Sequence, residues 1–354
     1  MDKTVQQQEI TLLLKDTNHT TEKKESKNFF IRNFNSYNNL KANNKLFSIF
    51  TNSLRIFIEI ILITLAVITI TFFLVDSSPG KPRLTSSLSD DAAKAINEKY
   101  GLDGSSWIRY THYLSNLIKF DFGITLSRSA PVEINDFIWN RFLTSFSIGL
   151  ISVVITLLIG VPIGVMAGKN PGKTFDAATT ILISIMISIP SMIFGLLILL
   201  LGRKMGIPYI YSSTNLITWI LPALALALPS IISYIRYIRT SMHDEIKSQH
   251  AKFAYLKGTT RNQFVWRHAL KPSLFPVATF FPIVILTSFL GGLFIEKIFL
   301  IPGSGSLTLE AVQNKDTYVL LFLTIIMSIL TIFSFYLRDA LYKIIDPRLR
   351  GRNG

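Results

Sequence analysis

Three stretches of the chain carry residue types and spacings that could do chemistry. AGKNPGKT (residues 167–174) approaches the phosphate-binding pattern G-x-x-x-x-G-K-[ST], in which backbone amides and a lysine hold nucleotide phosphates. GSGS (residues 303–306) offers hydroxyls that a neighbouring base could activate as nucleophiles. HAKFAYLKGTTRNQFVWRHALKP (residues 250–272) mixes basic, aromatic and apolar residues, which suits binding to a partner or to a lipid surface.

The first stretch misses the phosphate-binding spacing. Its first position holds Ala167, and counting from Gly168 leaves the spacing one residue short. It also lies within a few residues of two long apolar runs, which leaves no room for a nucleotide-binding sheet. We therefore predict a short basic turn here, and a chain that binds no ATP itself.

The serines of the second stretch lack an obvious base. The five histidines are His19, His112, His243, His250 and His268, and none lies within a long apolar run. Proline, glycine and serine favour a turn, so we expect IPGSGS to be one. The scattered histidines argue against a metal site, and the absence of cysteine excludes disulfides and thiolate chemistry. We predict no catalytic, metal or cofactor-binding residues.

Composition indicates a membrane protein. The 354 residues are 49% hydrophobic and 16% charged, with a mean hydropathy of +0.40; soluble proteins carry about 25% charged residues. The net charge of +14 comes from 36 Lys and Arg against 22 Asp and Glu. In a membrane protein the placement of these bases matters more than their number, and we expect no nucleic-acid partner.

Six apolar runs are long enough to cross a bilayer as helices, which requires about 20 residues each. No alternating β pattern competes with them, so we predict an all-α membrane protein with six transmembrane helices. The predicted spans are Ile56–Val75, Leu143–Ala167, Ala178–Leu201, Leu216–Ile238, Leu274–Ile295 and Tyr318–Leu337.

Basic residues predict the orientation of these spans. Nine Lys and Arg lie in the segment up to residue 55 and seven lie in the loop 239–273, whereas the loop 76–142 balances eight bases with eight acids. The positive-inside rule places both termini and the loop 239–273 in the cytoplasm, and the loop 76–142 outside. Arg203 and Lys204 count against this orientation but are outnumbered.

The predicted organisation follows from the spans. Residues 1–53 form a polar cytoplasmic extension whose composition predicts disorder. Residues 54–75 form the first transmembrane helix and 76–142 the extracellular segment. Residues 143–345 form a core with five transmembrane helices and the cytoplasmic loop 239–273, and 346–354 form a cytoplasmic tail.

The predicted spans hold no ionisable residue near their centres. Glu59, Arg236 and Glu296 fall near span ends, where we expect their charged groups to reach the interface. This argues against ion-driven carriers and proton relays, which keep such groups in the membrane. An ion channel is disfavoured because no charged ring or filter-like segment is present. An intramembrane hydrolase would need a histidine or an acid pair within a span.

Small residues and prolines are what the spans do contain. Gly160, Gly164 and Gly168 recur every four residues in the second span. Two interpretations stay open: close helix packing with proline kinks, or helices that line a pathway able to rock open.

The loop 239–273 is predicted to form two short helices. Ser241 and Asp244 have capping-box spacing ahead of the first helix, and Gly258 can end it in the left-handed conformation. Thr260 and Gln263 form a second capping box.

The first of these helices is predicted to be amphipathic. Ile246, Phe253 and Leu256 fall near one face, among lysines, while Pro272 is expected to stop the second helix. The apolar face has no predicted partner within the chain. It could lie on the bilayer or enter a groove on another protein.

The same loop resembles a motif of a known family. FAYLKGTTRNQFVWRHALKPSLFPV resembles the "EAA" loop of binding-protein-dependent ABC importer permeases, in its peptide-transporter form. Ala254 and Gly258 fall on the second Ala and the Gly of that motif, and WRHAL, followed by Leu274 and Pro276, is similar to the peptide subfamily.

Further motifs extend the resemblance over nearly everything after residue 54. YGLDGSSWIRYTHYLSNLIKFDFGITL and LIGVPIGVMAG resemble the segment after the first span and the second span of B-type peptide permeases. GGLFIEKIFLIPGSGSLTLEAVQNKDTYVL is similar to the family's "ET-F--PG-G-L---A---RD-P", and YKIIDPRLR is similar to its closing "-IDPR-R".

The resemblance implies a type I ABC importer permease (MetI-like) bundle in the plasma membrane. Such a chain forms a translocation pathway with a second homologous permease. Two cytoplasmic ABC ATPase subunits bind and hydrolyse ATP, and an extracellular peptide-binding protein delivers dipeptides or oligopeptides. A nickel or other small-solute importer of the same architecture is the alternative.

The resemblance also implies which residues contact the ATPases. Two of them depart from the motif, since Lys252 stands at its Glu and Phe253 at its first Ala. The predicted ATPase-coupling residues are Lys252, Phe253, Ala254, Lys257, Gly258, Arg261, Trp266 and His268. The sequence does not indicate which residues line the substrate pathway.

Overall fold

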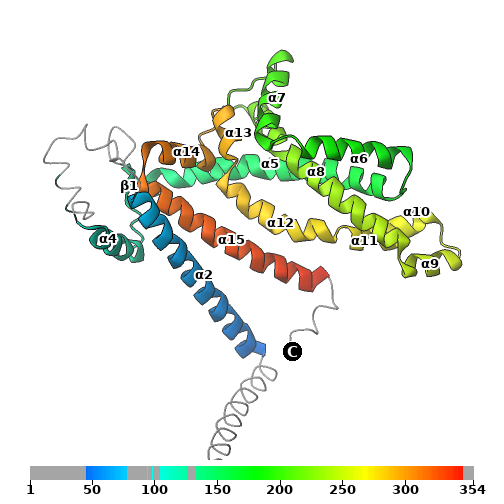
Figure 1. Cartoon of the computed structure of the whole chain (residues 1–354), viewed down its shortest axis with the longest axis horizontal. Helices are drawn as coiled ribbons and strands as arrows, with labels where there is room; N and C mark the ends of the chain where they lie inside the picture. The colour runs from blue at the N-terminus through cyan, green and yellow to red at the C-terminus, as the bar shows by residue number, and fades with distance from the viewer. Residues whose placement is uncertain (1–44, 78–93, 95–97, 99–103, 126–131, 346–354) are drawn as a thin grey trace, which may run out of the picture. The chain divides into compact units, whose positions relative to one another are not determined.

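The computed structural model describes residues 45–77, 94, 98, 104–125 and 132–345 (Figure 1). The extension 1–44, most of the segment 78–103 and the tail 346–354 lie outside these residues, as do the predictions made for them. The chain divides into two units, Met1–Ile61 with Asn353–Gly354, and Leu62–Arg352. All contacts described below lie within the second unit.

Long apolar helices dominate the described residues. Five are long and apolar enough to cross a membrane. This confirms an all-α, multi-pass membrane protein. They are α2 (Lys45–Asp76), α5 (Ile134–Gly168), α8 (Ile217–Lys247), α15 (Thr317–Ile345), and the run from α12 (Phe275–Thr287) through the short helix η3 (Ser288–Leu290) to α13 (Leu293–Ile298).

The predicted third span differs from a straight helix. It consists of α6 (Thr174–Ile187) and α7 (Ser191–Lys204), which meet at an angle of 102°. Pro190 stands at the break, where its missing amide hydrogen and its ring end the preceding helix. In Figure 1 α7 turns away from the direction of α6. The described residues therefore contain six spans if this bent pair counts as one, and five if it does not.

Close packing joins α5 to α8, as the row of glycines predicts. A methyl group at Gly164 would lie 2.9 Å from Cβ of Ile238, and one at Gly168 would lie 2.6 Å from Cβ of Met242. Any side chain at these positions would push the two helices apart. The glycines therefore permit the backbones to approach, which confirms the small-residue packing interpretation.

Short elements complete the fold. A two-residue antiparallel ladder pairs Ile124 with Glu133 and Thr125 with Val132. The hydroxyl of Thr125 donates a hydrogen bond of 2.6 Å to the buried carboxylate of Asp316, just before α15. The remaining elements are α4 (Ser106–Ile118), β1 (Ile124–Thr125), β2 (Val132–Glu133), α9 (Gln249–Leu256), α10 (Arg261–Phe264), η2 (Val265–Ala269), α11 (Leu270–Ser273) and α14 (Ser304–Asn314).

Glu296 lies in a buried polar network, here called the Glu296 network. Its side chain is 1% exposed. Its carboxylate accepts hydrogen bonds from the hydroxyl of Ser145, at 2.6 Å, and from the amide of Ser306, at 2.9 Å. The amide of Ser304 donates in turn to the Ser145 hydroxyl, at 2.8 Å.

This network corrects two predictions. Glu296 does not reach the interface, because the donors around its carboxylate replace water within the protein. GSGS is not a plain turn either, since Ser304 begins α14 and both of its serines are buried. The hydroxyl of Ser304 donates to the backbone oxygen of Phe289, at 2.6 Å, which ties α14 to η3.

Candidate functional site

The residues between α8 and α12, 248–274, are called the connecting segment. Local signals within it are confirmed: Gly258 has φ +86° at the end of α9, and Thr260 and Gln263 form both bonds of a capping box before α10. The capping box predicted at Ser241 is wrong, because α8 continues through it to Lys247. The hydroxyl of Ser248 caps α9 instead, accepting from the Ala251 amide at 3.1 Å.

The second half of the segment is one helical run with a π turn in it. The run extends from Arg261 to Ser273 and includes the π helix η2. It ends one residue after Pro272, and α12 begins after Leu274 alone. A π turn widens the helix and shifts the side chains that follow. No sequence signal that we used predicts it.

One face of the connecting segment is anchored to the long helices. Ala251, Phe264, Val265 and Ala269 are buried. They pack with Val165 of α5 and with three residues of α8, Tyr234, Ile238 and Met242. Since these contacts span both halves of the segment, α9 and α10 are held as one body against the ends of α5 and α8.

Aromatic rings surround Phe264, a fully buried residue of this anchor. The ring of Phe264 lies 5.0 Å from that of His250, 5.3 Å from that of Tyr255 and 5.8 Å from that of His268, between centroids. His268 therefore covers the anchor from outside, while its own side chain stays exposed. Ring contacts of this kind fix the orientation of the two halves of the segment.

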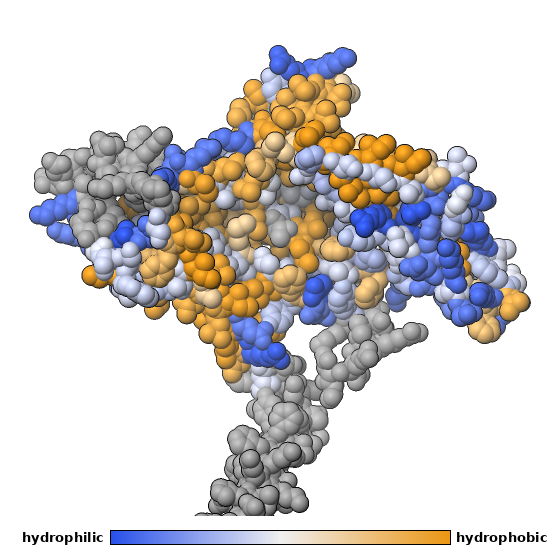
Figure 2. Space-filling view, viewed as in Figure 1, coloured by the Kyte–Doolittle hydropathy of each residue, from blue (hydrophilic) through white to orange (hydrophobic). Residues whose placement is uncertain are grey.

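The other face of the segment presents apolar side chains to the outside. Phe253 is 66% exposed, Leu256 is 83% exposed and Trp266 is 57% exposed. Phe253 and Leu256 lie three residues apart on α9 and so share a face. Ile246 does not share it, because it belongs to α8 and is partly buried. Figure 2 shows a mainly hydrophilic surface over α9–α11 with an apolar patch at its end.

The remaining predicted coupling residues lie around this face. Ala254 is partly buried against the anchor, whereas the others are exposed: Lys252, Lys257, Gly258, Arg261 and His268. The structure thus gathers the predicted set on α9, on the turn after it and on the run from α10 to η2. Which of these residues contact another protein stays a prediction.

Polar contacts that the sequence did not reveal hold the start of α6 and the turn before it to α8 and to the connecting segment. Arg261 Nε donates to the backbone oxygen of Lys169, at 3.0 Å. Asp176 of α6 pairs with Arg239 of α8, at 2.5 Å. The partners are 63 to 92 positions apart, so spacing alone could not reveal them. The sequence could have indicated this pair only by placing an acid, Asp176, and an arginine, Arg239, each near the end of a predicted span.

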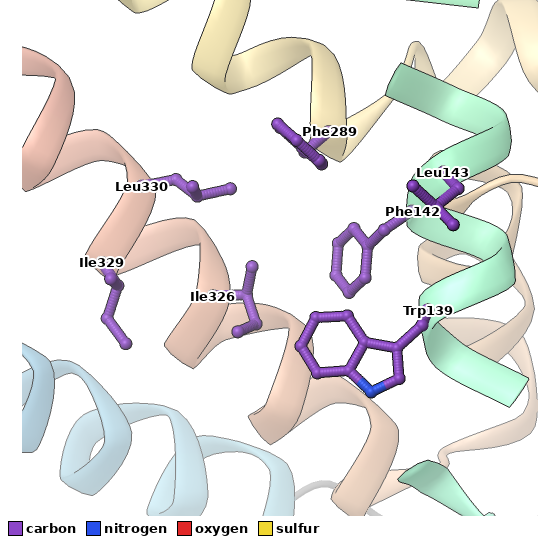
Figure 3. A pocket seen from close by; sticks show the side chains of 7 residues that line it. All are labelled: Trp139, Phe142, Leu143, Phe289, Ile326, Ile329 and Leu330. Carbon is purple, nitrogen blue, oxygen red and sulfur yellow. The ribbon is translucent and has the colours of Figure 1, made fainter. Parts of the chain in front are cut away.

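A separate apolar pocket of about 200 Å³ lies between α5, η3 and α15 (Figure 3). Its lining carries no charged group, so it suits only an apolar group. Within the described residues no three of His, Cys, Asp and Glu lie close enough to hold a metal ion. The pocket is lined by Trp139, Phe142, Leu143, Phe289, Ile326, Ile329 and Leu330.

Comparisons with known proteins identify a family that matches this chain. Residues 160–351, more than half of the chain, match the family described as "Binding-protein-dependent transport system inner membrane component". The oligopeptide transport system permease protein AppB of Bacillus subtilis is 30% identical over 302 residues, which are 81% of this chain and 95% of the relative.

Two further relatives agree. The dipeptide transport system permease protein DppB of Bacillus subtilis is 30% identical over 81% of this chain and 93% of the relative. The oligopeptide transport system permease protein OppB of Salmonella typhimurium is 31% identical over 84% and 98%. The predicted resemblance is thereby confirmed, and the chain belongs to the family of binding-protein-dependent transport system inner membrane components.

Proposed function

We propose that this chain is the membrane-spanning permease subunit of an ATP-driven importer of dipeptides and oligopeptides. The observation that carries the proposal is the connecting segment, which is anchored on one face and presents Phe253 and Leu256 on the other. The relatives described above are named as dipeptide and oligopeptide permeases. No observation favours the nickel alternative.

In this proposal the chain is not itself an enzyme. It forms the pathway with a second homologous permease, and an extracellular binding protein delivers the peptide. Two ATPase subunits bind ATP in the cytoplasm. The turn at residues 169–173 supports this division, because the amide of Gly172 already donates to Asp176 Oδ2, at 2.9 Å. The carboxylate of Asp176 thus accepts from a backbone amide that, in a phosphate-binding turn, would donate to a nucleotide phosphate.

The orientation is part of the proposal: both termini and the connecting segment face the cytoplasm. The chain has no cysteine, so single introduced cysteines can report it. Ser105 is exposed at the start of α4, and Gln249 is exposed beside the capping residue of α9. We expect an impermeant thiol reagent to label Ser105→Cys in intact cells and Gln249→Cys only after lysis. Labelling of Gln249→Cys in intact cells would show that the connecting segment faces outward, which would contradict the proposed orientation.

Truncating Phe253 tests the docking of ATPases. We expect Phe253→Ala to insert and accumulate normally, because the ring is largely exposed and little packing is lost. Exposed aromatic anchors often contribute more than about 1 kcal/mol to an interface, so recovery of co-purified ATPase should fall about fivefold or more. Peptide uptake should fall with it.

Phe294→Ala is the matched control, since this ring is half-exposed on α13, and Figure 1 shows α13 apart from α9, α10 and α11. It should leave ATPase recovery unchanged. The rival is a helix that lies on the lipid surface without a protein partner. Unchanged ATPase recovery and uptake in Phe253→Ala would support that rival and overturn docking through α9.

A further inference from the structure

A buried polar cluster lies where the turn between α5 and α6 meets the end of α8. Asp176, the third residue of α6, is only 4% exposed. Its Oδ1 accepts from Arg239 Nε at 2.5 Å, and its Oδ2 accepts from the Gly172 amide at 2.9 Å. His243 Nε2 lies 3.5 Å from Oδ1. One carboxylate therefore joins the first turn of α6, the preceding turn and two successive turns of α8.

The same turn is held from a third side. Arg261, the first residue of α10, donates to the backbone oxygen of Lys169. Gly168, next to it, packs against Met242 of α8, and the sulfur of Met242 accepts from the Ser273 hydroxyl at 3.6 Å. The start of the run from α10 to α11 thus holds the α5–α6 turn through Arg261, while the other end of that run contacts α8 through Ser273.

Within the described residues, no other polar side-chain contact joins α6 to a neighbouring helix. The hydroxyls of Thr179, Thr180 and Ser184 all donate to carbonyl oxygens one turn earlier in α6 itself. Exposed apolar side chains such as Ile181 and Ile185 fill much of its surface. Ile183 packs against Ile231 and Ile232 of α8 through apolar contacts, but among the described hydrogen bonds and ion pairs of α6 side chains those of Asp176 alone reach another helix. α6 leads directly into α7 across the 102° bend.

We propose that Asp176 and Arg239, together with Arg261, form a joint that makes the bent pair α6–α7 follow movements of the connecting segment. Apolar contacts can slide with little loss of buried area, because they are not directional. A buried ion pair resists separation, since each charge would be left without its partner. Asp176 and Arg239 are thus positioning residues for transport. The inference rests on the proposed function, in which ATPases move the connecting segment.

The test uses the complete importer, with its ATPases and binding protein, reconstituted in lipid vesicles. Asp176→Asn keeps the shape of the side chain and removes its charge, and Arg239→Gln removes the opposite charge. Arg236→Gln is the matched control, because Arg236 is exposed one turn earlier on α8 and lies over the neighbouring ring of Tyr237. ATPase recovery, ATP hydrolysis and peptide uptake are measured side by side.

We expect Asp176→Asn and Arg239→Gln to keep ATPase recovery close to that of the parent. Uptake should fall about tenfold, within the range of measured couplings between sites, so the ATP hydrolysed per peptide imported rises. Arg239→Lys, which keeps the charge, should restore part of the uptake lost in Arg239→Gln. Arg236→Gln should match the parent in all three measurements.

Movement can be measured directly with spin labels on Ser184→Cys of α6 and Gln249→Cys of α9, both exposed positions. If the joint holds, the distance between the labels stays nearly constant when ATP is trapped. With Asp176→Asn added, trapping ATP should change or broaden that distance. A merely stabilising contact would not produce this nucleotide dependence.

Three outcomes decide the inference. Normal uptake in both Asp176→Asn and Arg239→Gln would overturn it. Equal losses of ATPase recovery and uptake, with an unchanged label distance, would also overturn it and leave the cluster a structural role alone. Failure of the unmodified chain to recover any ATPase would instead refute the proposed function, which is a separate result.

Discussion

The Glu296 network and the connecting segment differ in how far their side chains are satisfied within the chain. In the network, the carboxylate, the hydroxyls and the amides around it satisfy one another, and its side chains are buried. The connecting segment buries one face and leaves Phe253 and Leu256 exposed on the other. The network is complete within the chain, so changing it should affect stability. The segment is incomplete, so changing its outer face should affect binding.

The largest expected effect is a loss of stability in Glu296→Ala. This change leaves two buried donors, the Ser145 hydroxyl and the Ser306 amide, without their acceptor. At about 1–3 kcal/mol for each stranded donor, the free energy of unfolding should fall by roughly 2–6 kcal/mol. Thermal and denaturant-induced unfolding of the purified chain in detergent measure it.

Glu310→Ala is the control for this prediction. Glu310 lies on the same side of the bundle, in a part-exposed pair with Lys297 at 4.0 Å. Pairs of this kind contribute about 0–1 kcal/mol, so its unfolding should resemble the parent's. Equal stability of Glu296→Ala and Glu310→Ala would show that the Glu296 network does not stabilise the fold.

An intermediate effect is expected at Gly258 of the connecting segment. Its φ of +86° strains any residue with a side chain, although nothing lies within 4 Å of where a Cβ would be. Gly258→Leu should therefore cost about 1–2 kcal/mol of stability, without a steric clash inside the chain. ATPase recovery should fall further than this strain explains, because the bulky side chain points away from the chain.

Gly258→Asn separates the two contributions, since asparagine tolerates the left-handed conformation better than leucine does. Unfolding measurements report the strain and co-purification reports the docking. If Gly258→Leu lowered stability and left ATPase recovery intact, the end of α9 would lie outside the interface.

The smallest effect is expected at Lys173, in the turn between α5 and α6. Its side chain is exposed and no ion pair of the described residues involves it. Lys173→Ala should change the free energy of unfolding by less than about 0.5 kcal/mol and leave uptake intact. Crosslinking of an ATP analogue to the isolated chain, lost in Lys173→Ala, would contradict the proposal that the chain binds no nucleotide.

Local signals account for what the sequence predicted well. Apolar runs of sufficient length predicted the spans, because only helices and closed barrels satisfy their backbone hydrogen bonds in lipid and no alternating β pattern favoured a barrel. The turn at Gly258 and the capping box at Thr260 depend on residues three or four positions apart. The exposure of Phe253 and Leu256 followed from helical spacing.

Long-range pairing accounts for what the sequence did not reveal. Pro162 and Pro282 remain inside their helices, whereas Pro190 ends one, and their local sequences do not separate these cases. Asp176 and Arg239 are 63 positions apart. Glu296 looked interfacial because its acceptor role depends on Ser145 in another helix.

The separation of Glu296 from Ser145 has a consequence for how the protein is made. The two residues are 151 positions apart. At about 5–20 residues per second, a ribosome needs roughly 8–30 s to travel from one to the other. Until Glu296 is made, the Ser145 hydroxyl of α5 lacks this acceptor. The Glu296 network therefore forms only near the end of synthesis. The hydrogen bond that holds α13 to α5 is absent until then.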